Sequence, residues 1–313
     1  MMHVGIQMRT SAGWPIDSWQ EGFEQLRRWG YEHVELAANG PRIDEAIDLS
    51  RLSNAQIVEV IRQARSVGLD VSGFQVHHGY QVADPDVLDD QVRHTRRMLD
   101  VAEAEGVGLV HVVTGMKPPH PSMPASPRLP APAASTGPVM SDQIYWQAMR
   151  DVFVNLLDYA GRRRVKLGIE QVFIYSVCNR QTLRGFFQLI DRDDLVWNCD
   201  PGHFVYHEES FRDAIGEFGC RIANAHIKDS RIFDDPHGEA AGTVDEMPGK
   251  RRFEFVAPGT GSVNQLDFVN ALHEVGFDGT LVVELPSNLP NRRQVACDMA
   301  PFVRRLIEQV QGS

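Results

Sequence analysis

Cysteine is scarce in this sequence. Its 313 residues contain four cysteines, none in a Cys-x-x-Cys pair: Cys178, Cys199, Cys220 and Cys297. Secreted domains that depend on disulfides carry many more cysteines for their length. The composition argues against a disulfide scaffold and predicts a protein of the reducing cytoplasm.

Long apolar runs are missing as well. No stretch approaches the ~20 consecutive apolar residues that span a bilayer. The N-terminal HVGIQM lacks the basic and apolar segments of a secretory signal. We therefore expect no membrane contact and no secretion, in keeping with a cytoplasmic location.

Basic residues do not dominate the charge. Lysine and arginine number 31 against 42 aspartates and glutamates, for a net charge of −11 at pH 7. Because an acidic protein repels phosphate backbones, nucleic acid is not an expected partner. Hydrophobic residues make up 42% of the chain, which is ordinary for a globular protein with a large core.

What the chain does contain is a regular alternation of short apolar runs and longer amphipathic segments. The runs are rich in Val, Ile and Leu, as strands buried on both faces are. The predicted strands are His3–Met8, His33–Ala37, Val71–His77, Leu109–Thr114, Lys166–Glu170, Val196–Asp200, Ile222–His226 and Thr280–Leu285. The predicted helices are Ser18–Trp29, Ser53–Ser66, Asp84–Glu105, Asp142–Arg164, Thr182–Ile190, Ser210–Glu217, Asn264–Val275 and Arg292–Gln311.

Eight strands in strict alternation with eight helices predict βαβ units and a parallel sheet. In a chain of this length the pattern favours a single (β/α)8 TIM-barrel domain over residues 1–313. An open doubly wound sheet is the alternative. The first strand runs on as QMRTSAGW and lacks the Gly-x-Gly-x-x-Gly turn of dinucleotide-binding sheets, which favours the barrel.

Two connections are longer than usual. Residues 116–141, after the fourth strand, are rich in Pro, Ala and Ser and predict an extended insertion. Residues 228–262 form a second long loop, after the seventh strand. Both are expected on the C-terminal rim of the barrel, where long loops are often functional. A tolerated surface insertion is the alternative for the Pro-rich loop.

Four consecutive strands carry a carboxylate or an imidazole at their ends. These residues are Glu170, Asp200, His226 and Glu284. Each alone is typical of a rim position or a hydrogen-bonded structural side chain. A closed barrel, however, brings the strand ends together on the face that carries active sites. Two Glu, one Asp and one His then form a mixed oxygen and nitrogen set that suits Mn²⁺, Mg²⁺, Co²⁺ or Zn²⁺.

Five motifs resemble those of one family. They are GIEQ (168–171), DPGHF (200–204), AHIKD (225–229), PGTGSVN (258–264) and FDGTLVVEL (277–285). In this order they resemble the xylose isomerase-like TIM-barrel superfamily, which holds sugar isomerases, epimerases and the endonuclease IV repair enzymes. The resemblance covers nearly the whole chain and is specific for the superfamily, but it does not name a substrate.

The resemblance implies one divalent metal, Mn²⁺ foremost, held by Glu170, Asp200, His226 and Glu284. It also implies that Glu170 and Glu284 act as acid and base on the carbon next to a carbonyl, through a metal-stabilised enediolate. His203 is expected to contact the substrate and to take part in catalysis. The expected activity is therefore that of an isomerase or epimerase acting on a keto sugar or related polyol.

Further substrate contacts are expected from His77, Arg231, Glu35, Lys228 and Trp14. Glu35, in HVELAA, resembles a glutamate often seen at the end of the second strand in this family, at the rim of the barrel. By alternation with Gln75, His77 should point into the barrel and His78 away from it. A rim ion pair with Asp229 is the alternative for Lys228, and loop packing is the alternative for Trp14. The glycines of PGTG are expected to be turn residues and not a phosphate cradle.

The sequence also departs from parts of the family pattern. Val172 stands where common relatives have a histidine, and QVFIYSVCN lacks the second acid of ketose 3-epimerases. Since the same metal and base can drive β-elimination, a lyase is the alternative. It would resemble a C-glycoside deglycosidase acting on a 3-keto-glycoside, or a keto-inositol dehydratase.

Two other readings are less favoured. An endonuclease IV-like nuclease would need a histidine where Val113 stands, and His111 lies in mid-strand instead, although Asp235 and His237 offer an Asp-x-His pair. A non-catalytic sugar-binding barrel would not need the four ligands. The expected assembly is a homo-oligomer, and the Pro-rich loop could dock a second subunit or admit a bulky aglycone.

Overall fold

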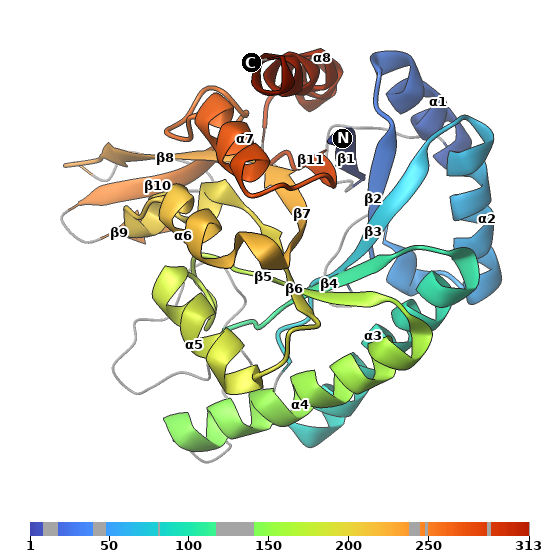
Figure 1. Ribbon diagram of the computed structural model, residues 1–313, viewed down its shortest axis with the longest axis vertical. Coiled ribbons are helices and arrows are strands. Elements are labelled where there is room, and N and C mark those ends of the chain that lie inside the picture. The colour runs from blue at the N-terminus through green and yellow to red at the C-terminus, as the bar shows by residue number, and fades with distance from the viewer. Residues whose placement is uncertain are drawn as a thin grey trace.

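The computed structural model describes residues 1–8, 18–39, 48–80, 82–116, 141–237, 245–247, 250–286 and 289–312. At its centre is a closed barrel of parallel strands in the order β1-β11-β7-β6-β5-β4-β3-β2 (Figure 1). These strands are β1 (His3–Met8), β2 (His33–Ala37), β3 (Asp70–Val76), β4 (Leu109–Val113), β5 (Lys166–Glu170), β6 (Leu195–Cys199), β7 (Ile222–Ile227) and β11 (Thr280–Val283). The predicted TIM barrel is confirmed.

Helices surround this barrel on the outside (Figure 1). They are α1 (Trp19–Trp29), α2 (Asn54–Ser66), α3 (Pro85–Glu105), α4 (Asp142–Arg163), α5 (Arg180–Ile190), α6 (Phe211–Phe218), α7 (Gln265–Glu274) and α8 (Arg292–Gln311). Predicted and observed boundaries differ by one or two residues in most elements. For example, β11 ends at Val283, two residues before the predicted end.

Local side-chain chemistry sets several helix ends. Ser53 and Gln56 form a capping box at the start of α2, which satisfies N–H groups that have no partner within the helix. Pro85 occupies the first turn of α3. Gly30 ends α1 with a φ of 98°, a left-handed conformation that glycine adopts without steric cost.

The barrel strands alternate between two environments. Residues such as Leu36, Ile169 and Ile227 belong to the apolar core formed with the helices. Many of the residues between them are polar, buried, and bonded to one another inside the barrel, as Glu35 and Asn224 show. The interior of this barrel is therefore a polar layer beneath the C-terminal face, and the main apolar core lies between strands and helices.

Residues 228–262 differ from the predicted long loop. They contain a small antiparallel sheet in the order β8-β10-β9, formed by β8 (Asp229–Asp234), β10 (Arg251–Val256) and β9 (Asp245–Met247). In Figure 1 this sheet extends from one side of the barrel. The period-two pattern of RRFEFV explains it, because Phe253 is fully buried while its neighbours are partly exposed. The Pro-rich insertion lies almost entirely outside the described residues, since 117–140 are not among them.

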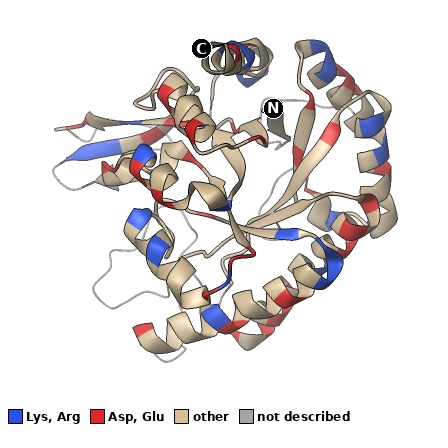
Figure 2. Cartoon of the chain, viewed as in Figure 1, with Lys and Arg blue, Asp and Glu red and all other residues tan. Residues whose placement is uncertain are grey.

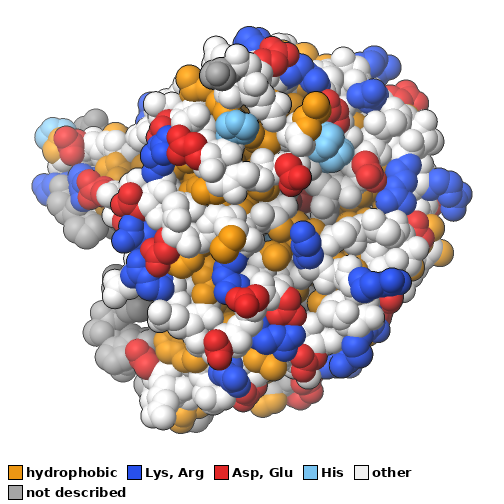
Figure 3. All heavy atoms as spheres, in the orientation of Figure 1, with side chains coloured by type: hydrophobic (Ala, Val, Ile, Leu, Met, Phe, Trp, Pro, Cys, Tyr) orange, Lys and Arg blue, Asp and Glu red, His pale blue; other side chains and the backbone are white. Residues whose placement is uncertain are grey.

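Acidic and basic side chains are interspersed over the outer helices and over the face shown in space-filling form (Figures 2 and 3). Within the part of the chain that the structure describes, no helix combines the length and apolar character required to cross a membrane.

Candidate active site

The four predicted ligands meet at the C-terminal face of the barrel. Glu170 ends β5, Asp200 follows β6, His226 lies in β7 and Glu284 follows β11. These four strands are neighbours in the barrel, and none of the four residues is more than 4% exposed. One polar atom from each lies within 4.8 Å of the others. The structure therefore brings together the side chains that the strand ends predicted.

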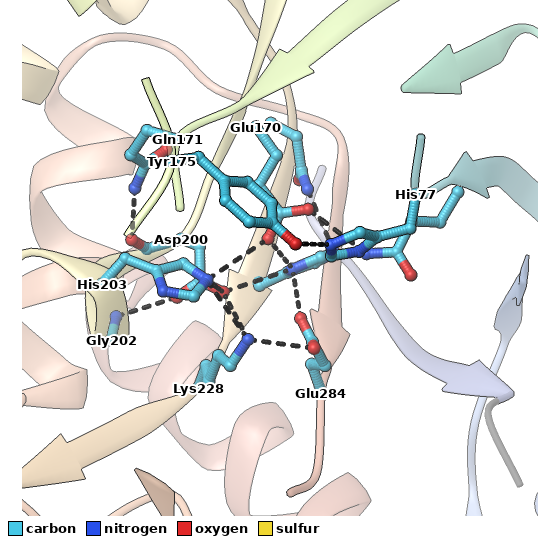
Figure 4. A network of polar contacts seen from close by, with 12 residues as sticks. His77, Glu170, Gln171, Tyr175, Asp200, Gly202, His203, Lys228 and Glu284 are labelled. Carbon is cyan, nitrogen blue, oxygen red and sulfur yellow. Dashed lines mark hydrogen bonds and ion pairs between the residues drawn. The ribbon is translucent and has the colours of Figure 1, made fainter. Parts of the chain in front are cut away.

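His226 Nδ1 lies in the middle of this set. It is 2.8 Å from Glu284 Oε2, 3.4 Å from Glu170 Oε1 and 3.5 Å from Asp200 Oδ2. Figure 4 shows Glu170 and Glu284 approaching the shared centre from opposite sides. The centre is thus surrounded by three carboxylate oxygens and one imidazole nitrogen.

The second polar atom of each ligand is held by another group of the protein. Glu170 Oε2 accepts from Gln75, Asp200 Oδ1 from the backbone N–H of Gly202, and Glu284 Oε1 from Lys228, while His226 Nε2 faces Glu35. Outer contacts of this kind orient metal ligands and select which atom each presents. Here they leave one atom of every ligand directed at the common centre.

Two atoms at the centre are suited to binding a cation. Asp200 Oδ2 and His226 Nδ1 are buried and form no hydrogen bond of regular geometry among the residues that the structure describes, although charged groups lie within 3.5 Å of both atoms. Buried polar atoms normally have partners, because leaving one unsatisfied costs free energy. Carboxylates and imidazole are ligands that Mn²⁺, Mg²⁺, Co²⁺ and Zn²⁺ accept. The donor set therefore fits one divalent ion.

The charges of the site depend on one another. Burial alone would raise the pKa of Glu170 and Glu284, but the cationic side chains of His226 and Lys228 hold both pKa values well below the ordinary range. Burial alone would lower the pKa of His226, but Glu35 and Glu170 raise it well above its usual value. Both glutamates are therefore ionised at neutral pH and available to bind a cation or accept a proton.

Glu35 lies inside the barrel, below the four ligands. It accepts hydrogen bonds from Gln7 Nε2 and Asn224 Nδ2, both at 2.8 Å, and it lies 2.8 Å from His111 Nε2. Its Oε1 is 3.2 Å from His226 Nε2. The residue is fully buried and is a partner of a ligand, whereas the sequence placed it at the rim as a substrate contact. It lies in the middle of β2, and strand tilt sets the depth of each residue.

Lys228 and Asp229 point in opposite directions. Lys228 is buried beside the ligands, with Nζ 2.9 Å from Glu284 Oε1. Asp229 turns away and accepts backbone N–H groups from the PGTG loop, among them those of Gly259 and Gly261 at 2.9 Å. The two side chains do not form the rim ion pair considered as an alternative. Asp229 instead anchors a loop in which Gly259 has a φ of 87°.

His203 lies at the edge of the cluster. Its Nε2 is 3.4 Å from Asp200 Oδ2 and 3.7 Å from Glu170 Oε1. The ring stacks on Phe173, with centroids 5.7 Å apart, and meets Phe255 edge-on at 5.3 Å. Because Phe255 belongs to β10, the small sheet contributes to the aromatic surroundings of the site.

His77 and His78 face different parts of the molecule, as alternation predicted. His77 Nε2 lies 2.6 Å from the hydroxyl of Tyr175, and Figure 4 shows this pair on the side of the cluster where Glu170 lies. His78 Nε2 lies 2.7 Å from Nδ1 of His94, a residue of α3. His77 is therefore near the candidate site, and His78 belongs to the packing outside the barrel.

One predicted substrate contact, Arg231, is not brought to the cluster. Arg231 lies on β8, where its guanidinium is 2.6 Å from Glu254 Oε1 and its side chain is 53% exposed. Trp14 lies outside the described residues. The two features considered for a nuclease are also engaged elsewhere. His111 contacts Glu35 inside the barrel, and Asp235 forms a partly buried ion pair with Arg252 at 2.7 Å.

Sequence reasoning missed several residues around the centre. They include Tyr175 and Phe255, which lie on a loop and on the small sheet, and the interior amides of Asn198 and Asn224. The sequence did contain a pattern that could have identified the two amides. A polar residue flanked by apolar ones in a strand with both faces buried, such as Asn224 in IANAHI, must find a partner inside the barrel.

The model of the xylose isomerase-like TIM-barrel family matches residues 23–306. The chain belongs to this family. The xylose isomerase-like chain is also 24% identical over 151 residues to the inosose dehydratase of Serratia proteamaculans (strain 568). That match covers 47% of this chain and 49% of the relative, so the chain spans about half the length of the curated relative that it matches.

Solved structures resemble the whole xylose isomerase-like chain. One is a xylose isomerase-like TIM-barrel protein from Mycobacterium smegmatis in complex with magnesium, with a TM-score of 0.72 and 16% identity. The superposition covers 99% of this chain and 97% of that protein. The 3-keto-D-glucoside 4-epimerase from E. coli has a TM-score of 0.71 and 15% identity, with coverage of 97% and 100%. At these identities the likeness shows the fold alone.

Proposed function

We propose that this chain is a divalent-metal-dependent isomerase or epimerase that removes the proton next to the carbonyl of a keto sugar or related polyol. The observation that carries the proposal is the pair of buried carboxylates, Glu170 and Glu284, which face one centre from opposite sides. Family membership supports it, because the proposed chemistry belongs to the sugar isomerases and epimerases of this family.

Glu170, Asp200, His226 and Glu284 would hold the ion. When bound, a divalent ion supplies Lewis-acid stabilisation of negative charge on the oxygens of the substrate. We propose Mn²⁺, with Mg²⁺, Co²⁺ and Zn²⁺ as alternatives that the same donor set accepts. The magnesium complex of a structure with the same fold supports a divalent ion without choosing among them.

Glu170 and Glu284 would exchange the proton. One ionised carboxylate takes the proton from one face of the carbon. The other carboxyl group, which would first have to take up a proton from water, delivers that proton from the opposite face, which inverts the configuration. Positioned acid and base groups contribute about 10²–10⁴-fold each to such reactions. His203 would contact a substrate oxygen, since its Nε2 lies beside both Asp200 and Glu170. His77, Lys228 and Arg231 remain proposed substrate contacts.

A lyase is the second proposed function. After the same proton is removed, the C–H electron pair forms a carbon–carbon double bond, and the bond to a leaving group on the next carbon breaks. The leaving group departs with the electron pair of the bond that breaks and takes up a proton, as water or as a glycoside aglycone. The match to an inosose dehydratase over about half of both chains favours this outcome. Only the fate of the carbanion distinguishes the two functions, so one assay addresses both.

The assay is deuterium uptake. The protein is loaded with Mn²⁺ in D₂O and incubated with ketoses, keto-inositols and 3-keto-glycosides. Epimerisation is expected to place deuterium on the carbon next to the carbonyl, whereas elimination gives an unsaturated ketone with strong ultraviolet absorbance. No uptake and no elimination across the panel would count against proton abstraction as the reaction.

Matched variants assign the acid and the base. Glu170→Gln and Glu284→Gln keep the size of each side chain and remove its proton-accepting oxygen. Each is expected to lower turnover by about 10²–10⁴-fold. Glu59→Gln, the same substitution on the outer helix α2, where the side chain is 45% exposed, is the control for the fold. Comparison of the KM of Arg231→Gln with that of the wild type separately tests the proposed substrate contact of Arg231.

We also propose a homo-oligomer, with a second subunit as an alternative partner of the Pro-rich insertion. Both are expectations from the sequence. Light scattering of the purified chain measures the assembly, and a mass of one chain in solution would contradict the proposed homo-oligomer.

A further inference from the structure

The ammonium of Lys228 occupies a position that has its own set of ligands. Its Nζ lies 2.9 Å from Glu284 Oε1, 3.3 Å from Asp200 Oδ2 and 3.3 Å from His203 Nε2. Two carboxylate oxygens and one imidazole nitrogen form a set that divalent cations accept. These four residues are all at least 94% buried. The ammonium is therefore surrounded like a bound ion.

This position is adjacent to the proposed metal centre. Glu284 directs Oε2 to His226 Nδ1 and Oε1 to Lys228, so the carboxylate faces both positions. Asp200 Oδ2 lies 3.5 Å from His226 Nδ1 and 3.3 Å from Lys228 Nζ, so a single oxygen faces both. Carboxylates shared in this way are typical of two-metal sites, whose ions lie about 3.5–4 Å apart.

Charge favours one ion and one ammonium. The three carboxylates of the ligand set are balanced by one divalent ion together with the Lys228 cation. Phe255 closes the remaining side, with its ring centroid 4.6 Å from Nζ, a distance at which the ring face attracts a cation. Removal of the ammonium would leave a buried negative charge without compensation, which is costly unless another cation replaces it.

We propose that Lys228 fills a second cation position and thereby restricts this centre to one divalent ion. A neutral side chain at position 228 opens a site for a second Mn²⁺, with Glu284 Oε1, Asp200 Oδ2 and His203 Nε2 as its ligands. The inference rests on the proposed metal centre but does not depend on the reaction that the centre catalyses.

Metal stoichiometry tests the inference. Wild type, Lys228→Met and Lys228→Arg are freed of metal with a chelator, loaded with Mn²⁺ and passed through gel filtration. Elemental analysis then gives the Mn²⁺ content per chain. Wild type and Lys228→Arg, which keeps the charge, are expected to bind one ion, and Lys228→Met is expected to bind two. The paramagnetic resonance spectrum of Lys228→Met should show two spin-coupled Mn²⁺ ions.

A double variant tests the ligand set. Lys228→Met combined with His203→Phe removes one of the three ligands of the second position and none of those of the first. It is expected to return to one ion per chain. Lys228→Gln, a second neutral variant, provides the same comparison if Lys228→Met does not fold, as judged by circular dichroism.

The outcomes separate the two proposals. One ion in wild type and still one in a folded neutral variant overturns the inference and leaves the metal centre intact. Loss of all Mn²⁺ from the neutral variant also overturns it, since Lys228 would then support the first position. A wild type that binds no divalent ion overturns the proposed function together with the inference.

Discussion

Glu35 Oε1 lies 3.2 Å from Nε2 of His226, while Nδ1 of the same ring faces three carboxylates. Because a carboxylate accepts hydrogen bonds, this contact makes Nε2 the nitrogen that carries the proton. Nδ1 then has its lone pair available for a metal. Glu35 is thus a positioning residue that acts through His226.

Glu35→Gln is expected to weaken Mn²⁺ binding by about 10–100-fold, the usual cost of losing the outer partner of a histidine ligand. A chelating dye in competition with the protein measures the affinity. Gln7→Met is the matched control, because it removes a different hydrogen bond to Glu35 and leaves the contact with His226 in place. Equal losses in the two variants would show a general effect on the fold and contradict the positioning role.

Binding of the divalent ion is expected to release about one proton per chain at neutral pH, because a metal ligand must be deprotonated. The pKa of His226 is raised, so the metal-free protein holds the proton that the ion displaces. Affinity should therefore increase with pH between about pH 6 and pH 8. Calorimetry in two buffers of different ionisation enthalpy counts the protons. An affinity independent of pH over this range would contradict the expected protonation of His226.

The raised pKa of His226 has the opposite effect on the stability of the metal-free protein, which should decrease as the pH rises. A raised pKa means that protonated His226 stabilises the folded state, fully so below the ordinary histidine pKa. This contribution is lost as the pH rises through the raised pKa. Metal-free protein should therefore lose stability with increasing alkalinity while its affinity for the ion increases.

Gly261→Ala is expected to lower the free energy of unfolding by about 1–3 kcal/mol, the usual cost of overpacking. A Cβ at this position would lie 2.3 Å from Asp229 Oδ1 and 2.5 Å from the backbone oxygen of Ser230. Denaturant unfolding measures the change. Gly108→Ala is the control, because its Cβ would meet nothing within 4 Å, and it should shift stability by less than about 0.5 kcal/mol. Equal effects at the two glycines would contradict the close packing of the PGTG loop on Asp229.

The barrel and the meeting of the four proposed ligands could be predicted because both follow from short-range patterns. Apolar runs mark strands buried on two faces, and a carboxylate or imidazole at the end of such a run is conspicuous. Glu170, Asp200, His226 and Glu284 all satisfied that description, and the closed barrel placed them together. No long-range information beyond barrel closure was required.

Depth and direction inside the barrel could not be predicted in the same way. Glu35 was predicted to lie at a strand end, but the tilt and stagger of the strands determine its height along the barrel axis. The sequence of a single strand does not reveal tilt or stagger. Lys228 and Asp229 follow β7 at a turn into β8, where strict alternation ends. Sequence therefore could not decide which of them faces the ligands. The segment RRFEFV does show the period-two alternation of a strand. It contains no continuous apolar run, which is the pattern that predicted the barrel strands.

The polar layer inside the barrel also has a consequence for folding. Its hydrogen bonds join five strands through Gln7, Glu35, His111, Asn198 and Asn224. A slip of β2 by two residues would preserve the inward and outward alternation, so burial of apolar side chains would hardly oppose it. It would nevertheless leave the carboxylate of Glu35 buried away from its donors, at a cost of several kcal/mol. The layer therefore selects one alignment of the strands, and the native register is the one in which the four proposed metal ligands meet.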